Sequence, residues 1–159
     1  MKTSFTTSGI APMQEKSGLG WASFQGQSFS APILEVAASP SYGSPSYFPR
    51  WQSPPSGSLK LNVDGSCLLE SSSIGAGGVI CDHTYNWIVG VYSFDGLGDS
   101  AKAEIMALRH GLILAWDKGF RNILCEMDNK NMVDIFNNNC CPDFHPHIAV
   151  VLIVLELIN

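Results

Sequence analysis

The sequence predicts an α/β domain whose mixed sheet is flanked by helices, and three observations support this. Residues 59–64 alternate apolar and polar side chains, which is the period of a half-buried strand. Residues 101–115 carry apolar side chains at helical spacing. A second strand pattern, at residues 123–128, follows that helix directly. A strand, a helical crossover and another strand predict a parallel pair within one sheet.

Two more strands are predicted between the first strand and the first helix. Residues 77–81 and 87–92 are short apolar runs. The polar turn at residues 82–86 is too short for a crossover, so it favours an antiparallel hairpin. The sheet is therefore expected to contain three antiparallel strands plus one parallel strand.

The helix ends carry capping residues. Asp99 or Ser100 suits the N-cap of the first helix, and Gly119 stands where a left-handed glycine commonly follows a helix. Two further helices are expected, at residues 130–136 and from His147 to the C-terminus. The expected order of elements is β-β-β-α-β-α-α.

The first fifty residues differ in composition from the rest of the chain. Residues 1–50 are rich in Ser, Thr, Gly and Pro and show no sustained period of 2 or 3.6. We expect them to form a largely disordered leader. The run from Pro54 to Gly57 then introduces a folded domain at residues 51–159.

The charge balance and the cysteines limit the possible partners and the cellular compartment of the protein. The 159 residues include nine basic and fourteen acidic side chains, for a formal net charge of −5. This balance argues against a generic basic nucleic-acid binder, but divalent cations can offset carboxylates and phosphates together. Five cysteines without a CxxC pair indicate a reducing, intracellular compartment, the nucleus or the cytoplasm. The apolar run 148–155 is too short to span a bilayer, so no membrane partner is expected.

Two cysteines and two histidines near the C-terminus raise the question of a zinc site. Cys140 and Cys141 lie close in sequence to His145 and His147. Adjacent cysteines rarely chelate one ion, so plain loop residues are the favoured interpretation.

Three carboxylates carry the strongest chemical signal. Asp64 and Asp128 end two strands that are predicted to be parallel, and Glu104 lies early in the helix between them. Ligands of open α/β sheets bind where such strands end. Each acid alone has a structural explanation, as a turn, a helix-dipole partner or an N-cap. Together they predict a magnesium site, because Mg²⁺ prefers hard oxygen ligands.

These residues lie within a longer set of motifs, namely Leu61–Ser66, Gly75–Asp82, Trp87-Ile88, Ala103–Leu108, Gly111-Leu112, Leu114–Asp117, Gly119-Phe120 and Glu126–Asp128. Taken together, these motifs resemble a known family, the ribonuclease H-like domain of plant retrotransposon reverse transcriptases. The resemblance extends from about Trp51 to the C-terminus.

The resemblance implies an endonuclease that cleaves the RNA strand of RNA–DNA hybrids. By this likeness Asp64, Glu104 and Asp128 are the catalytic residues and bind two Mg²⁺ ions, with Mn²⁺ as an alternative. Gly65 and Ser66 would contact the nucleic acid, where the 2′-hydroxyl distinguishes RNA from DNA. Asn129, which stands where the family usually has serine after the third acid, is expected to contact the nucleic acid as well.

The sequence also departs from the family. The fifth strand and the last helix, which carries a fourth metal-binding aspartate, are expected to be missing, and Glu156 is a poor substitute. Residues 51–159 contain twelve acids and six bases, which weakens hybrid binding. The alternative is therefore a catalytically impaired nucleic-acid-binding remnant, with self-association through an uncovered sheet edge. An actin-like or sugar-kinase ATPase also begins with a strand ending in Asp-Gly, but it requires a second phosphate loop that this chain lacks.

Overall fold

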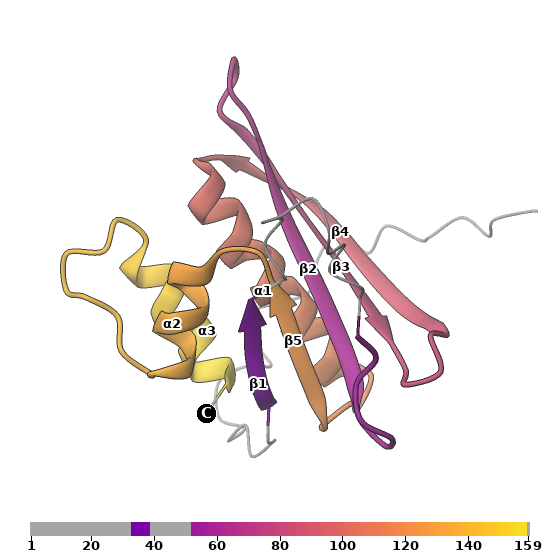
Figure 1. The fold of residues 1–159 in the computed structure, drawn as a ribbon. Helices are drawn as coiled ribbons and strands as arrows, with labels where there is room; N and C mark the ends of the chain where they lie inside the picture. The colour runs from indigo at the N-terminus through magenta and orange to yellow at the C-terminus, as the bar shows by residue number, and fades with distance from the viewer. Residues whose placement is uncertain (1–32, 39–51, 159) are drawn as a thin grey trace, which may run out of the picture.

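The computed structural model describes residues 33–38, as backbone only, and residues 52–158 (Figure 1). Within these ranges the chain forms five strands and three helices. The elements are β1 (Ile33–Ala38), β2 (Leu59–Leu68), β3 (Ser73–Cys81), β4 (Trp87–Leu97), α1 (Ser100–Asp117), β5 (Ile123–Met127), α2 (Lys130–Asn137) and α3 (Ile148–Ile158).

The strands form one mixed sheet in the order β1-β5-β2-β3-β4. The β2–β3 and β3–β4 pairs are antiparallel, whereas β5 is parallel to both β2 and β1. The α1 helix makes the crossover between β2 and β5. The predicted α/β fold, with three antiparallel strands and a parallel strand after the helix, is therefore confirmed.

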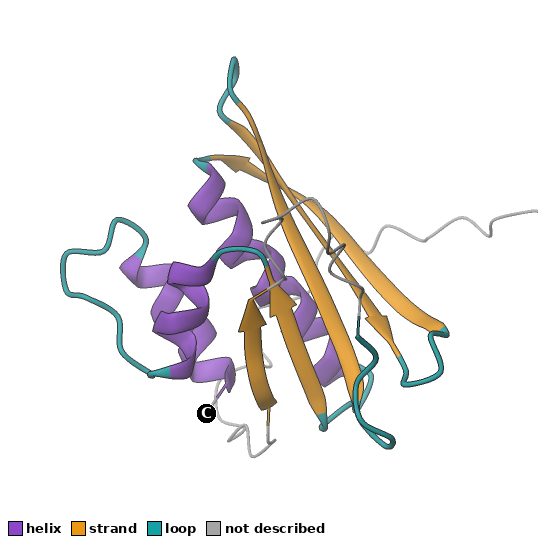
Figure 2. Cartoon of the chain, viewed as in Figure 1, coloured by secondary structure: helices purple, strands orange, loops and turns teal. Residues whose placement is uncertain are grey.

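The helices share one hydrophobic core with one face of the sheet, and Figure 2 shows them gathered on that side of the strands. Leu61 and Ile80 of the sheet are fully buried there against Ile105 and Leu108 of α1. The opposite face, which we call the open face, carries the alternate residues of β2, β3 and β4. Within residues 52–158, all three helices pack on the core side. None of these helices is long and apolar enough to cross a membrane.

The β2–β3–β4 meander is longer than expected. The glycine at position 65 does not end β2, which continues to Leu68 and remains paired with β3 as far as Ser73. In the same way β4 continues past Tyr92 to Leu97. Continuous antiparallel pairing satisfies the backbone N–H and C=O groups of these residues, which outweighs the turn propensity of Asp-Gly.

The edge of the sheet beside β5 is occupied, contrary to expectation. Residues 33–38 were assigned to a disordered leader, but they form β1, which pairs in parallel with β5 from Ile33↔Ile123 to Ala38↔Met127. A fifth strand is therefore present, and it comes from the N-terminal side of the chain. The expectation of an uncovered edge beside β5 was therefore wrong. The expected absence concerned another strand, the one that follows the last helix in the family, and β1 does not contradict it. The other leader residues lie outside the described ranges.

The helix ends agree with the sequence. Asp99 is the N-cap of α1, and its Oδ1 accepts a hydrogen bond from the backbone N–H of Lys102 at 2.8 Å. Gly119 follows α1 with φ +75°, as expected for a left-handed C′ glycine. The expected helices at 130–136 and from His147 form with ends shifted by one residue.

Deleting residues 1–38 should destabilise the domain, because the deletion leaves the backbone groups along β5 without their β1 partners. We expect a lower urea midpoint and concentration-dependent association by size-exclusion chromatography. Deleting residues 1–30 retains β1 and serves as the matched control. Equal midpoints for the two deletions would show that β1 contributes nothing to stability.

Candidate active site

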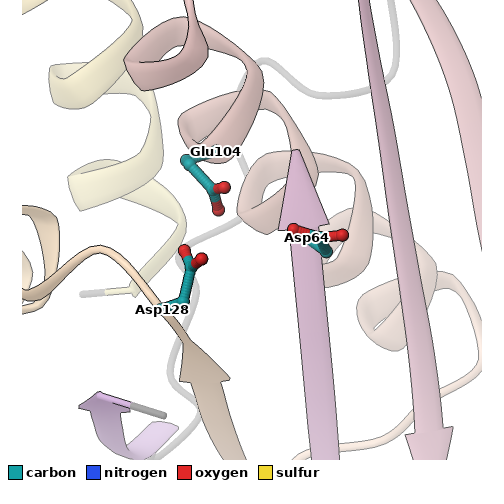
Figure 3. A group of neighbouring side chains, drawn as sticks. All are labelled: Asp64, Glu104 and Asp128. Atoms are coloured by element: carbon teal, nitrogen blue, oxygen red, sulfur yellow. The ribbon is translucent and has the colours of Figure 1, made fainter. Parts of the chain in front are cut away.

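The candidate site lies where the two central parallel strands separate. The β2–β5 pairing has its last register pair at Asn62↔Glu126. Asp64 lies two residues further along β2, and Asp128 follows the end of β5. Figure 3 shows the two carboxylates on either side of the gap between the strands. Because the backbones are no longer hydrogen-bonded to each other there, a third side chain can enter.

That third side chain is Glu104 of α1. The helix reaches this position because it packs closely on β2 at Gly65, where an added Cβ would lie 2.3 Å from the carbonyl carbon of Ala103. No side chain fits in that space, so glycine is required by the close approach of helix and strand. The backbone N–H of Gly65 donates a hydrogen bond to the Glu104 carboxylate. Strand and helix thus fix the position of this acid together.

The structure brings the three predicted acids together. One carboxylate oxygen from each of Asp64, Glu104 and Asp128 lies within 4.8 Å of the other two. Asp64 and Asp128 are exposed, but Glu104 is only 6% exposed, and its Oε2 is buried without a hydrogen-bond partner. Burial, followed by the nearby charges of Asp128 and Asp64, raises the pKa of Glu104 to about 7.

These features fit a divalent cation. A buried carboxylate oxygen without a partner is costly, and a cation would satisfy it. Three converging carboxylates supply the hard oxygen ligands that Mg²⁺ and Mn²⁺ prefer. A cation would also remove the mutual repulsion that raises the pKa of Glu104. The donor set therefore suits a metal centre, although the geometry does not select one ion.

Comparison with known proteins places this site in context. A family model described as reverse transcriptase-like matches residues 62–159, which include all three acids. The chain belongs to the reverse transcriptase-like family. It is also 31% identical, over 96 residues, to an Arabidopsis thaliana protein provisionally named a ribonuclease H protein. That match covers 60% of this chain but 15% of the Arabidopsis protein.

Two solved structures that share this fold are ribonucleases H. RNase H1 of the halophilic archaeon Halobacterium salinarum superposes with a TM-score of 0.59 at 19% identity, covering 64% of this chain and 77% of that one. LC11-RNase H1, isolated from compost and solved in complex with an RNA/DNA hybrid, superposes with a TM-score of 0.56 at 16% identity. It covers 62% of this chain and 75% of its own. These likenesses establish a ribonuclease H-like fold for this member of the family.

The other predicted nucleic-acid contacts lie around the acids. Ser66 is exposed on the open face, two residues after Asp64. Gly65 faces α1, so its contribution comes from its backbone. Asn129 is the N-cap of α2, and its Oδ1 accepts a hydrogen bond from the N–H of Met132 at 3.3 Å. Contact of these residues with nucleic acid stays a prediction. Glu156, exposed on α3, is not part of the acid group.

A buried ion pair lies behind the acids and was not foreseen. Lys60 of β2 is 2% exposed, forms an ion pair with Glu126 of β5 and donates to the carbonyl oxygen of Gln52 at 2.8 Å. Both residues precede the acids on the same face of their strands. The pair neutralises Glu126, so that this carboxylate adds little repulsion to the site. Its only sequence signal is a charged residue at an alternate position in each strand.

Two histidines link elements around the site. His147, just before α3, places its Nε2 2.9 and 2.8 Å from the two carboxylate oxygens of Asp99, the N-cap of α1. His110 of α1 lies 2.7 Å from Oδ1 of Asp95 in β4. Both contacts join separate elements of the fold, so these two histidines are best explained as structural residues.

Replacing Gly65 by alanine should destabilise the protein by about 1–3 kcal/mol, because the new methyl group would overlap the backbone of α1. Chemical denaturation measures the change. Gly77→Ala is the matched control on the neighbouring strand, since its Cβ would come no closer than 3.8 Å to another residue. A Gly65→Ala variant as stable as the control would contradict the close contact.

Metal-free protein should lose stability as the pH rises from about 4.5 to 7. The folded state holds the Glu104 proton more tightly than the unfolded state, so ionisation at higher pH costs folding free energy. In EDTA, Glu104→Gln should therefore be more stable than the unaltered protein at pH 8, by about 1–3 kcal/mol, and similar to it at pH 4.5.

The control for this comparison is Glu156→Gln, which changes an exposed helical glutamate. It should leave the pH profile of the urea midpoint unchanged. Adding Mg²⁺ at pH 8 should stabilise the unaltered protein more than Glu104→Gln. Parallel pH profiles for all three proteins would contradict the buried, repelled state of Glu104.

Proposed function

We propose that this domain is an RNase H-type endonuclease that hydrolyses the RNA strand of RNA–DNA hybrids with the help of divalent cations. The observation that carries the proposal is the convergence of Asp64, Glu104 and Asp128 within 4.8 Å. It occurs in a ribonuclease H-like fold and in a member of the reverse transcriptase-like family. The structural relative solved with an RNA/DNA hybrid supports this class of substrate.

In this proposal the three carboxylates hold two Mg²⁺ or Mn²⁺ ions. When bound, such ions activate water and stabilise the leaving oxygen of a phosphodiester. The chain itself contributes position and charge. Glu104 is held by the Gly65 N–H and the surrounding core, so it needs little rearrangement to act as a ligand. The exposure of Asp64 and Asp128 leaves room for a phosphate and water.

A second candidate function is hybrid binding without cleavage. Within the described residues the only candidate metal-binding group contains three carboxylates, and no fourth acid joins it. Fewer ligands weaken metal affinity, which would reduce catalysis before it abolished binding. This alternative predicts salt-sensitive binding of the hybrid with no hydrolysis.

Incubation with a labelled RNA–DNA hybrid in Mg²⁺ or Mn²⁺ should release RNA fragments that end in a 3′-hydroxyl and a 5′-phosphate. Asp64→Asn should lower the rate by about 100-fold or more, because it removes a charged metal ligand. Denaturing gels resolve the fragments, and a DNA duplex of the same sequence should stay intact.

Asp134→Asn is a matched control, because Asp134 is an exposed acid on α2 outside the acid group. It should cleave the hybrid at the unaltered rate. Folded protein that binds the hybrid but never cleaves it would favour the binding function. Cleavage that survives Asp64→Asn would overturn the proposed site.

A further inference from the structure

The open face continues from the acid site across the sheet in two rows. The register places Asp64 beside Gly77, and Gly77 beside Tyr92. The next row runs from Ser66 through Gly75 to Phe94. Directly paired residues share a face of the sheet, so all six side-chain positions face the same way. We call this surface the glycine trough, and it consists of Asp64, Ser66, Gly75, Gly77, Tyr92 and Phe94.

The floor of the trough is bare backbone. An added Cβ at Gly77 would have no neighbour closer than 3.8 Å, the carbonyl oxygen of Val91. Glycine is therefore not needed there to avoid a clash, and it lacks the positive φ that would favour it. Glycine inside a strand weakens the strand and often marks a place where a ligand approaches the backbone.

The far wall is aromatic and exposed. Tyr92 is 76% exposed and Phe94 is 75% exposed. Their outward direction is fixed by the residues between and after them. Asp95 accepts a hydrogen bond from Ser93 at 2.6 Å and contacts His110 of α1 at 2.7 Å on the core side. A one-residue slip of β4 would break both contacts and bury the rings.

The dimensions and chemistry of the trough suit a nucleoside. Its walls on β2 and β4 are two strand spacings apart, about 10 Å, which is comparable with a ribose and its base. One wall begins at the acid group, whose buried Glu104 Oε2 has no partner. The other carries two exposed aromatic side chains, which can make apolar contacts with a ribose or a base. A phosphate at the acid site would thus leave its nucleoside over the glycine floor.

We propose that the glycine trough binds the nucleoside next to the phosphate held at the acid site, with Tyr92 and Phe94 in contact with its base and ribose. This proposal rests on the proposed nuclease function. It assigns substrate contacts to two residues of β4 outside the acid group. It also explains why the floor between Asp64 and Tyr92 carries no side chain.

The test measures binding of a fluorescein-labelled RNA–DNA hybrid by anisotropy in Ca²⁺, with gels to show that the hybrid stays intact. The Tyr92→Ser/Phe94→Ser double variant should weaken binding about tenfold or more, because it removes two aromatic contacts with the nucleoside. Gly77→Val should do the same by filling the trough. It should also fold normally, because valine favours strands and the site has room for a Cβ.

Trp87→Ser is the matched control. It removes another exposed aromatic side chain, 68% exposed, from the same strand, about 17 Å from Tyr92 along β4. Its affinity for the hybrid should equal that of the unaltered chain. As a direct readout, an RNA strand carrying 5-iodouridine should crosslink on irradiation to the peptide that contains Tyr92 and Phe94.

The outcomes separate this proposal from the nuclease function. If the unaltered chain binds and cleaves the hybrid while the double variant and Gly77→Val match it, the trough is overturned and the nuclease function stands. If the unaltered chain neither binds nor cleaves, both are overturned. A dimer that the double variant converts to monomer, with hybrid affinity unchanged, would identify an interface between two copies and overturn the nucleoside site. If the double variant fails to fold, Gly77→Val and the crosslink decide.

Discussion

The close contact between α1 and β2 determines the rest of the site. Two glycines, one on each element, set this contact. Gly65 of β2 leaves no room for a Cβ against Ala103, and Gly111 of α1 would place a Cβ 2.7 Å from Cδ2 of Leu61. Because the two contacts are about two turns apart along α1, they fix both the distance of the helix from the sheet and its tilt. A larger residue at either place would move Glu104 away from Asp64.

The separation of β2 and β5 provides the other half of the geometry. While the strands are paired, their backbones leave no gap for a side chain from the helix layer. Once the pairing has ended beyond Asn62↔Glu126, Glu104 can reach between the strands toward the open face. The fold thus brings Glu104, a buried acid of the helix layer, next to Asp64 and Asp128, which are exposed acids of the sheet. The buried position supplies the raised pKa, and the exposed positions supply access.

Much of this could be predicted from local sequence, and the failures share one physical cause. Strand alternation, the Asp99 cap and the positions of Asp64, Glu104 and Asp128 are local signals, and they led to the correct fold class. The β1 strand is different, because it pairs with β5, which lies about ninety residues later in the chain. No local pattern encodes that pairing. The burial of Lys60 depends likewise on contacts with Glu126 and Gln52, which are distant in sequence or outside the strand. The strand position of Phe94 was missed because aspartate and glycine follow it, and these residues usually mark the end of a strand.

An acidic chain that binds nucleic acid needs a source of affinity other than lysine and arginine. Residues 51–159 carry twelve acids and six bases, and one of those bases, Lys60, is paired with Glu126. In the proposed complex, divalent cations reverse the charge at the three carboxylates and attract the phosphate. Apart from Asp64, the residues of the trough are uncharged, so they add contact with the nucleoside without adding repulsion. Because few lysines or arginines would displace counterions from the hybrid, salt should weaken binding less steeply than it does for a basic protein. Cation concentration and pH should matter more, since a cation bound by Glu104 must displace the proton that this carboxyl group holds near neutrality.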